Sequence, residues 1–319
     1  MALELVQCVP NFSEGQDAEV MDALADAVRR SPGVALVDRT ADPDHHRMVL
    51  TFLGEPEAVE EAALAAARVA VERIDLTRHA GVHPRMGALD VLPFVPVGGT
   101  SMQTCVQLAR RAGARLAAEL GLPVYFYEEA ATHPDRRNLA VVRGAGFDSL
   151  RREPLLGERA PDAGPEQVHP TAGAVAVGAR GPLLAYNVNL RTTDVEIARA
   201  VARRVRERDG GLVGLKALGL SLETPGCAQV SLNVTQPAGV PLYRVFELVK
   251  LEAARYGVPV SGSELIGAIR LEEVLEVVRY YLGLHELQPS QVLDLWAARL
   301  EGAAEGAAGS AERGSDAER

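Results

Sequence analysis

The order of predicted strands and helices constrains the fold of this sequence more than any other feature. In the first third of the chain, alternating or apolar segments predict strands at residues 3–9, 34–37, 48–53 and 89–95. Apolar residues at helical spacing predict amphipathic helices at residues 17–30 and 57–74. Turn-forming and polar residues predict loops at 11–15 and 38–46. The resulting order is strand, helix, strand, strand, helix, strand, which is typical of the ferredoxin-like, or split βαβ, arrangement.

The same order returns in the second half of the chain. Strands are predicted at residues 183–190, 215–222, 228–234 and 258–260, and helices begin at Thr192 or Thr193 and at Pro241. The sequence therefore predicts an α+β fold of two tandem ferredoxin-like subdomains, residues 1–181 and 182–300. Additional elements are predicted at residues 102–120, 123–127, 271–282 and 289–300. Residues 301–319 are rich in Gly, Ala, Ser and Glu, and we expect a disordered tail.

Composition and charge disfavour several classes of function. The 319-residue chain carries a formal net charge of −10, which argues against binding to nucleic acid or to an anionic membrane surface. No apolar run approaches the roughly 20 residues of a membrane span, and the N-terminus lacks the pattern of a secretory signal. Cys8, Cys105 and Cys227 lie far apart, so we expect buried thiols in a reducing, cytoplasmic environment.

The connection between the second predicted helix and the strand that follows it is unusually long. It spans residues 75–88, whereas the equivalent connection in the second half needs only residues 256–257. A long insertion at an otherwise tight connection is more often functional than a minimal loop. Gly81 and Pro84 flank His83 and break regular structure, which predicts a loop position for this histidine. Because histidine titrates near neutral pH, His83 could act as a general acid and base.

Several polar side chains could complete a site around His83. A carboxylate could orient the histidine, and the sequence leaves four candidates open: Asp38, Asp42, Asp44 and Asp90. The guanidinium groups of Arg47 and Arg85 could bind substrate carboxylates or could form surface ion pairs. Asn187 and Asn189 share one face of a predicted strand, and this face could line a ligand or contact solvent.

A metal site is the weaker interpretation of the histidines. His79 and His83 are four residues apart, as on a zinc-binding helix, and His45 and His46 could join them. The loop predicted around His83 is incompatible with such a helix, and no acidic residue lies between the pair to act as a base. We therefore expect no metal. Glycine motifs for nucleotides and a nucleophile elbow for a serine hydrolase are also missing from the sequence.

Four segments of the sequence resemble the formiminotransferase family. They are VQCVPNFSEG (residues 6–15), RHAGVHPRMGALDVLPFVPV (78–97), LAYNVNL (184–190) and AQVSLNV (228–234), and the resemblance extends over residues 3–300. It implies a glutamate formimidoyltransferase, which transfers the formimino group of N-formimino-L-glutamate to N5 of tetrahydrofolate in histidine degradation. It also implies two ferredoxin-like subdomains with ligand bound between them, tetrahydrofolate as co-substrate, and a homodimer.

The resemblance further implies roles for individual residues. His83 matches the family's catalytic histidine. The family's folate-binding segment matches ten consecutive residues: Gly164, Pro165, Glu166, Gln167, Val168, His169, Pro170, Thr171, Ala172 and Gly173. Two positions depart from the pattern, because Thr40 stands where bifunctional animal enzymes have an aspartate and His46 stands where asparagine is usual. No cyclodeaminase domain follows, so a separate cyclodeaminase is implied, together with small-molecule substrates that include polyglutamylated folate.

Other functions stay open from the sequence. The same scaffold could use 5-formyltetrahydrofolate, either to formylate glutamate or to cyclise the folate. The departures at Thr40 and His46 are compatible with a folate-binding protein that has lost catalysis. A metal-dependent hydrolase built on the histidine cluster is a further alternative. An assay that compares formimino and formyl donors, with and without a chelator, distinguishes these alternative functions from formimino transfer.

Overall fold

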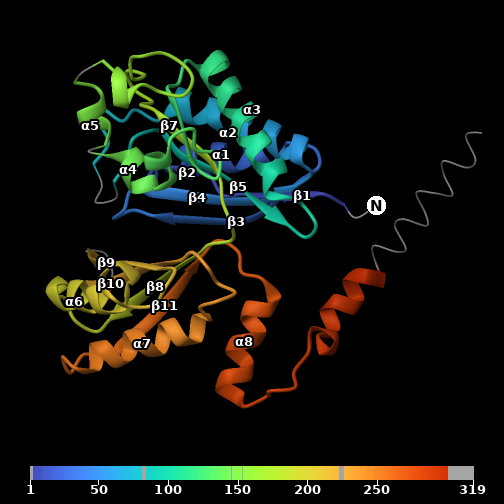
Figure 1. The fold of residues 1–319 in the computed structure, drawn as a ribbon, viewed down its shortest axis with the longest axis vertical. Coiled ribbons are helices and arrows are strands. Elements are labelled where there is room, and N and C mark those ends of the chain that lie inside the picture. The colour runs from blue at the N-terminus through green and yellow to red at the C-terminus, as the bar shows by residue number, and fades with distance from the viewer. Residues whose placement is uncertain (1–2, 81–83, 145, 153, 223–225, 301–319) are drawn as a thin grey trace, which may run out of the picture.

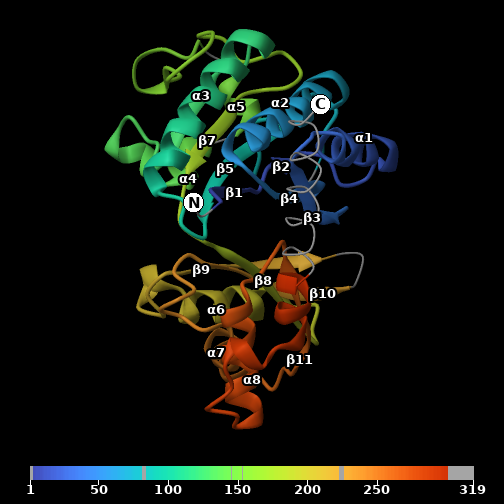
Figure 2. The same ribbon diagram turned by 90° about the vertical axis from the view of Figure 1, so that its right-hand side faces the viewer.

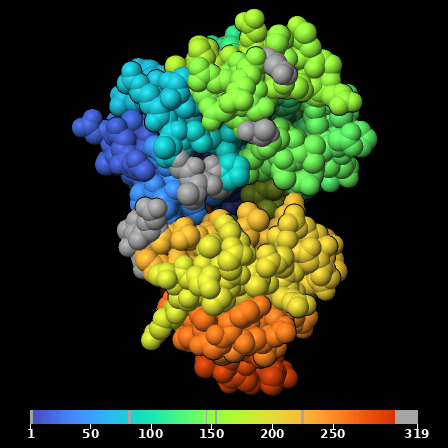
Figure 3. All heavy atoms as spheres, turned by 90° about the vertical axis from the view of Figure 1, so that its left-hand side faces the viewer, coloured from blue at the N-terminus to red at the C-terminus, as the bar shows by residue number. Residues whose placement is uncertain are grey.

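The protein forms two lobes, each built on one β-sheet (Figure 1). The structure, a computed structural model, describes residues 3–80, 84–144, 146–152, 154–222 and 226–300. The two sheets face each other, and the longer helices cover their outer sides (Figure 2). Residues of the first lobe, coloured blue to green, lie directly against the yellow and orange residues of the second lobe (Figure 3).

The first lobe is built on a mixed sheet. Its strands are β1 (Leu5–Cys8), β2 (Asn11–Phe12), β3 (Val34–Asp42), β4 (Arg47–Gly54), β5 (Leu89–Val97), β6 (Val124–Glu128) and β7 (Val175–Ala179). Its α-helices are α1 (Ala18–Arg29), α2 (Pro56–Arg73), α3 (Met102–Leu120), α4 (Leu139–Arg143) and α5 (Phe147–Leu150). Across the sheet, β3 is followed by β4, then by β1 and β2 in one position, then by β5, β7 and β6. The pairs that involve β7 are parallel and the others are antiparallel.

The second lobe is an antiparallel sheet with two helices on one face. Its strands are β8 (Leu184–Leu190), β9 (Leu215–Leu222), β10 (Cys227–Val234) and β11 (Val260–Ile266). The α-helices are α6 (Val195–Val205), α7 (Leu242–Ala254) and α8 (Leu271–Leu282). Val188 and Leu190 of β8 pack with residues of α6 and α7 in a separate hydrophobic core. The spatial order of the strands is β11, β8, β10, β9.

The two sheets share one arrangement of their strands. In each, the first strand of the unit lies between the third and the fourth: β1 between β4 and β5, and β8 between β10 and β11. This shared order explains why both halves of the sequence show the same succession of elements, and the predicted α+β fold with two subdomains is confirmed. The lobes touch where Gly267 meets β4, since a Cβ atom at Gly267 would lie 3.0 Å from the Oγ1 of Thr51.

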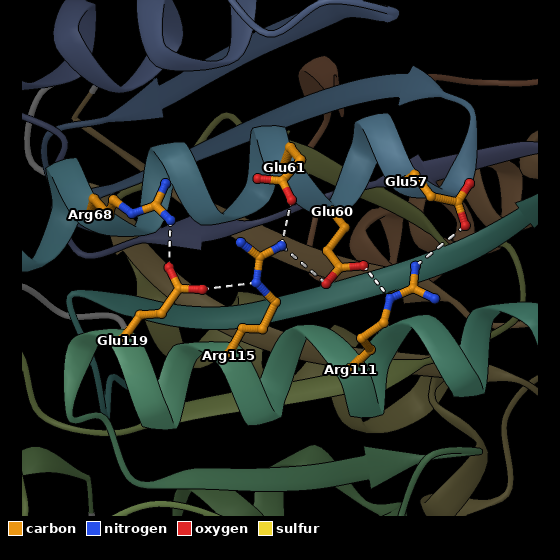
Figure 4. A network of polar contacts seen from close by, with 7 residues as sticks. All are labelled: Glu57, Glu60, Glu61, Arg68, Arg111, Arg115 and Glu119. Atoms are coloured by element: carbon orange, nitrogen blue, oxygen red, sulfur yellow. Dashed lines mark hydrogen bonds and ion pairs between the residues drawn. The ribbon is translucent and has the colours of Figure 1, made fainter.

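An arginine and glutamate network joins α2 to α3 on the outer side of the first sheet (Figure 4). The carboxylate of Glu60 on α2 is almost fully buried and pairs with both Arg111 and Arg115 of α3. Glu119 bonds Arg115 on its own helix and Arg68 on α2. A buried carboxylate is tolerated only when its charge is compensated, so the two arginines together keep Glu60 stable between the helices.

The predicted loop at residues 38–46 is wrong for its first five residues, and the predicted strand at 34–37 is too short. β3 continues to Asp42, because Asp38, Thr40 and Asp42 pair with β4. β3 is an edge strand, and one of its faces is open, so that Val37 is 52% exposed instead of buried. A half-exposed strand carries polar residues at little cost, and composition alone therefore suggested a loop.

Other boundaries also differ from the sequence prediction. The link at residues 11–15 contains β2, and the buried strand β7 was missed because its five residues are small and apolar without alternation. α6 is capped by the side chain of Asp194 instead of Thr192 or Thr193. The last strand, predicted at 258–260, extends to Ile266 as β11. The helix predicted at 289–300 begins as the 3-10 turn Pro289–Gln291 and becomes α-helical only from residue 293.

Candidate active site

One edge of the first sheet carries a concentration of polar side chains. β4 and β5 both begin at this edge, on either side of β2. A small pocket there is lined by Asn11, Phe12, Ser13, His45, His46, Arg47, His79, Arg85 and Asp90. These residues come from the segment before α1, from the turn between β3 and β4, and from the long connection between α2 and β5. The connection that the sequence marked as functional therefore contributes to a polar pocket.

The segment before α1 holds the other two stretches of chain together. Ser13 donates from its backbone nitrogen to the carbonyl of Ala88 (2.9 Å) and from its hydroxyl to the carbonyl of Gly87 (2.8 Å). Gly15 lies against the turn between β3 and β4, where a Cβ atom would lie 2.4 Å from the carbonyl oxygen of Asp42. Only glycine permits so close an approach of two backbones.

The carboxylate of Glu14 is the centre of this junction. Its Oε1 accepts hydrogen bonds from the backbone N–H groups of Gly15 (2.9 Å), Gln16 (2.8 Å) and Asp17 (2.9 Å), and Nε2 of His46 lies 3.1 Å away. Burial alone would raise the pKa of Glu14, but the backbone N–H groups and the charge of His46 outweigh burial and lower this pKa below its ordinary value. Glu14 is therefore an anion at neutral pH.

His46 donates hydrogen bonds from both of its ring nitrogens. Nε2 faces the Glu14 carboxylate, and Nδ1 lies 2.8 Å from the carbonyl oxygen of Ala80. Each partner presents an acceptor oxygen, so each contact needs a proton on the ring nitrogen that makes it. The carbonyl of His46 in turn accepts from Nε2 of His79 (2.9 Å), and the two rings stack with centroids 3.9 Å apart.

His79 is the neutral member of this stacked pair. Burial lowers the pKa of His79 to about 4, and the hydrogen bond to His46 offsets the effect of burial only in part. Its Nε2 proton is committed to the carbonyl of His46, so Nδ1 has a lone pair. This Nδ1 is shielded from solvent and has no hydrogen-bond partner among residues 3–80 or the other described ranges.

The low pKa of His79 predicts that the protein loses stability as the pH falls from about 6.5 towards 4. The unfolded chain binds a proton at His79 near the ordinary value of about 6.5, whereas the folded chain does not. After allowance for partial exposure to solvent, we expect a contribution on the order of 2 kcal/mol. Urea unfolding at pH 7.5 and pH 5.0 measures it, with His79→Gln as the control.

Glutamine keeps a donor close to the position of Nε2 but does not titrate, so the His79→Gln variant should lose less stability between the two pH values than the wild type does. Other histidines, such as His169, contribute equally to both proteins and cancel in the comparison. Equal losses in the two proteins would contradict the assignment of the pH dependence to His79.

Asp90 fixes the chain between Pro84 and β5. Its Oδ1 accepts from the backbone nitrogen of Met86 (2.7 Å), and its Oδ2 accepts from Nε (3.0 Å) and Nη2 (2.6 Å) of Arg143 on α4. The side chains of Asp90 and Arg143 are only 4% and 16% exposed. Asp90 was one of four carboxylates that could orient His83, and both of its oxygens are engaged in these structural contacts.

The other three candidate carboxylates lie on β3 and in the turn after it. Asp38 accepts from the hydroxyl of Thr40 (2.7 Å) on the same face of the strand. Asp42 accepts from the backbone nitrogen of His45 (2.8 Å), and its second oxygen lies 3.5 Å from Nδ1 of that histidine. Asp44 lies in the turn between β3 and β4. The choice among these carboxylates as the partner of His83 stays a prediction.

The two arginines predicted to bind carboxylates differ in their surroundings. Arg47 donates from Nε to Oδ1 of Asn11 (3.0 Å), and its Nη2 also contacts this oxygen. Burial lowers the pKa of Arg47 to about 10, which leaves it cationic at neutral pH. Arg85 donates from Nη2 to the carbonyl of His79 (2.7 Å), but its buried Nε has no partner within the described chain. Arg85 therefore has a buried Nε donor that no described residue uses.

The predicted folate-binding segment, residues 164–173, lies along the same edge of the sheet. Its first four residues are exposed and its last two are buried. The carbonyl of Thr171 accepts from the nitrogen of Leu76 (2.9 Å), and the carbonyl of Ala172 accepts from the nitrogen of Ala88 (2.8 Å). The end of the segment therefore packs against the connection that carries His79 and Arg85.

Asn187 and Asn189 lie on β8, on the face of the second sheet that points away from α6 and α7. Asn187 donates to Oε2 of Glu264 (3.3 Å), and Asn189 accepts from Nε2 of Gln229 (2.9 Å). Asn187 and Gln229 are both buried, so this face is not simply exposed to solvent. Oε1 of Gln229 is buried without a hydrogen-bond partner in the described part of the chain.

His83 lies outside the described residues, so its predicted role stays a prediction. Sequence reasoning missed three residues that organise the edge: Asn11, Glu14 and Arg143. Their partners are 36, 32 and 53 positions away in the sequence, and no local pattern pointed to Asn11 or Arg143. Glu14 alone had a local signal, because it precedes a helix N-terminus, where carboxylates commonly accept backbone N–H groups.

Metal binding finds little support in the donor atoms. Among the described residues, no group of three or more His, Cys, Asp or Glu side chains is placed to hold a metal ion. Both ring nitrogens of His46 act as donors, so this histidine offers no lone pair to a metal.

In the described ranges, no helix has the length and apolar character needed to cross a membrane.

Comparisons with known proteins point to one family for both lobes. A family model described as the formiminotransferase domain, N-terminal subdomain, matches residues 5–180, and the formiminotransferase domain model matches residues 185–293. A glutamate formimidoyltransferase of Streptococcus pyogenes serotype M1 is 44% identical over 283 residues, which are 89% of this chain and 95% of that protein. The glutamate formimidoyltransferase of Thermoplasma acidophilum is 43% identical over 92% of this chain and 97% of its own length. A formimidoyltransferase-cyclodeaminase of Mus musculus is 43% identical over 89% of this chain, but the match covers only 53% of that protein.

Proposed function

This chain belongs to the formiminotransferase family, and we propose that it transfers the formimino group of N-formimino-L-glutamate to N5 of tetrahydrofolate. The observation that carries the proposal is the identity of 43–44% with glutamate formimidoyltransferases over about nine tenths of the chain. Tetrahydrofolate is then the co-substrate that receives the one-carbon group. Two relatives, from Streptococcus and Thermoplasma, match over 95% or more of their own length, as expected for a transferase that works with a separate cyclodeaminase.

The reaction requires two proton movements, and one histidine can supply both. The lone pair of N5 attacks the formimino carbon and forms a tetrahedral adduct. N5 then loses a proton to the imidazole of His83, and the imidazole returns this proton to the glutamate nitrogen. The bond between the formimino carbon and the glutamate nitrogen breaks, which leaves glutamate as a free amine and the formimino group on N5. Such proton transfer contributes about 10²–10⁴-fold to the rate.

Side chains at the edge of the first sheet have the chemistry to hold the anionic substrates. The Nε donor of Arg85, which has no partner among the described residues, suits a carboxylate of glutamate or of folate, whereas Nε of Arg47 donates to Asn11. Residues 164–173 are the candidate folate-binding segment, and their contact with the connection would bring the folate close to this edge. Asn187 and Asn189, on the inner face of the second sheet, are candidates for the other side of the ligand cleft.

A homodimer in the cytoplasm is the state in which we expect the enzyme to work. At the end of α8 and beyond it, the chain carries large apolar side chains at the surface: Leu282, Leu293 and Leu300 are 68%, 78% and 70% exposed. A second copy of the chain could bury these side chains, and light scattering after size-exclusion chromatography measures the mass. We further propose that the subdomains divide at residues 181 and 182.

The proposed function predicts a strict preference for the donor. We expect the protein to convert tetrahydrofolate with N-formimino-L-glutamate, read as methenyl-tetrahydrofolate after acidification, and to do so at the same rate in the presence of a strong chelator. Replacing the donor with 5-formyltetrahydrofolate and glutamate should give no transfer. Turnover only with the formyl donor would replace the proposed function by a formyltransferase or a cyclo-ligase, and folate binding without turnover would indicate a binding protein.

A further inference from the structure

Asp162 and Arg136 form a buried ion pair beside the start of the candidate folate-binding segment, residues 164–173. Their side chains are only 5% and 11% exposed, and Nη1 of Arg136 lies 2.8 Å from Oδ2 of Asp162. Arg136 belongs to the 3-10 turn η1 (Pro134–Arg137), which follows β6. The ion pair therefore joins the chain that leaves β6 to the chain that enters the segment.

Asp162 fastens the entrance of this segment to β6. Its Oδ2 accepts from the backbone nitrogen of Phe126 (2.8 Å), and its Oδ1 accepts from the hydroxyl of Thr132. The backbone adds two bonds, from the nitrogen of Asp162 to the carbonyl of Val124 (2.8 Å) and from the nitrogen of Val124 to the carbonyl of Ala163 (2.9 Å). The carboxylate and the backbone therefore hold the same short stretch of chain against the strand.

Arg136 fixes the residues just before Asp162. Its Nη2 donates to the carbonyls of Glu158 (3.1 Å) and Ala160 (2.6 Å), and its guanidinium carbon lies 5.2 Å from the centre of the Tyr125 ring. A buried guanidinium needs a negative partner, and Asp162 supplies one. Loss of the carboxylate charge would therefore loosen the contacts of Arg136 as well as those of Asp162.

The far end of the segment is held by contacts of its own. His169 and Gly173 exchange two backbone hydrogen bonds of 3.0 Å, and the nitrogen of Ala172 donates to Nδ1 of His169 (3.0 Å). Gly173 lies so close to the chain before β5 that a Cβ atom would be 2.2 Å from the carbonyl oxygen of Met86. Residues 164–167 are exposed. The segment is thus an exposed loop between two fixed ends, and the first end depends on a buried ion pair.

We propose that Asp162 and Arg136 are positioning residues for folate, because they hold residues 164–173 in an ordered conformation before the folate binds. This inference rests on the proposed function, in which these residues bind tetrahydrofolate. Asp162 and Arg136 touch no substrate in it. A loop that becomes ordered only on binding loses affinity, whereas a preorganised loop does not. The ion pair therefore acts on the affinity for folate and leaves the binding of N-formimino-L-glutamate and the proton transfer unchanged.

Three substitutions separate this role from a general loss of stability. Asp162→Asn removes the charge at nearly constant shape, and Thr132→Val removes only one hydrogen bond to Asp162. The matched control is Glu60→Gln, because the side chain of Glu60 is also 5% exposed and also pairs with arginine. Glu60 lies in the network between α2 and α3, on the outer side of the first sheet (Figure 4). Urea unfolding measures the stability that each variant loses.

The affinity for tetrahydrofolate is measured by calorimetry in the absence of the donor. We expect Kd to rise about tenfold in Asp162→Asn and about threefold in Thr132→Val, with a parallel rise in KM for tetrahydrofolate. For both variants, kcat and KM for N-formimino-L-glutamate should stay within about threefold of the wild type. Glu60→Gln should bind tetrahydrofolate as the wild type does, even where its urea midpoint falls as far.

Two results would overturn the proposal: an unchanged Kd in Asp162→Asn, or an equal rise of Kd in Glu60→Gln. If Asp162→Asn does not fold, an unchanged Kd in Thr132→Val has the same meaning. Hydrogen–deuterium exchange locates the effect, because a peptide that covers residues 164–173 should exchange at least about tenfold faster in Asp162→Asn than in the wild type or in Glu60→Gln.

The same measurements keep this inference apart from the proposed function. A wild type that binds tetrahydrofolate without transferring the formimino group would refute the proposed function, and the Kd values would still decide the role of Asp162. A wild type that transfers the group, with the same Kd in every variant, would refute the positioning role alone. A wild type that does not bind tetrahydrofolate would refute both.

Discussion

The substitution His83→Ala is expected to lower kcat for formimino transfer about 10²–10⁴-fold, with small changes in both KM values. This range is the usual contribution of a general acid and base. His46 is committed as a donor on both nitrogens, and His79, with a pKa of about 4, is too weak a base near neutral pH. Steady-state kinetics with both substrates varied measure the effect.

A control variant and rescue by added imidazole test whether the loss of activity is specific to His83. His285 is an exposed histidine of the second lobe, and His285→Ala should retain wild-type kcat. Added imidazole should restore part of the activity of His83→Ala, because a free imidazole can carry the same proton. A folded His83→Ala protein with unimpaired turnover would remove His83 from the mechanism.

The second large effect is expected for Asp90→Asn, which should lower the free energy of unfolding by about 3–5 kcal/mol. The substitution leaves the buried guanidinium of Arg143 without its negative partner and weakens the bond to the backbone of Met86. Because these contacts hold the chain that follows Pro84, kcat should also fall. Urea unfolding and steady-state kinetics measure the two effects.

A double variant tests whether the unpaired charge causes the loss. In Asp90→Asn combined with Arg143→Met, the unpaired guanidinium of Arg143 is removed, and we expect part of the lost stability to return. A double variant that is destabilised by the sum of the two single effects would show that Asp90 and Arg143 act independently. The ion pair would then have no part in holding α4 to the sheet.

The sequence predicted best those elements whose ends are marked by local signals. α3 runs from Met102 to Leu120 as predicted, because Ser101 caps its first turn and Gly121 adopts a left-handed conformation at its end. β3 and β7 were predicted poorly for a different reason. The polar half of β3 becomes a strand only through its register with β4, and β7 is defined by the neighbours that bury it.

In the candidate active site too, features marked by local signals were predicted better than features that depend on distant contacts. The long connection, with His79, Arg85 and Asp90, was found because its glycines, prolines and charged residues stand out within one stretch of sequence. The roles of Glu14, His46 and Arg143 arise from contacts between residues more than 30 positions apart, which no local pattern encodes. The histidine cluster that the sequence left as a weaker, metal-binding interpretation included His46, whose two ring nitrogens make hydrogen-bond contacts.

In the proposed reaction, the formimino carbon and the nitrogen attached to it move together from glutamate to folate. The most direct measurement uses N-formimino-L-glutamate labelled with ¹³C and ¹⁵N in the formimino group, with mass spectrometry of the products at neutral pH before any acid treatment. We expect both labels on the folate and no label in the released glutamate. Labelled nitrogen released as free ammonia, with an unlabelled folate, would contradict it.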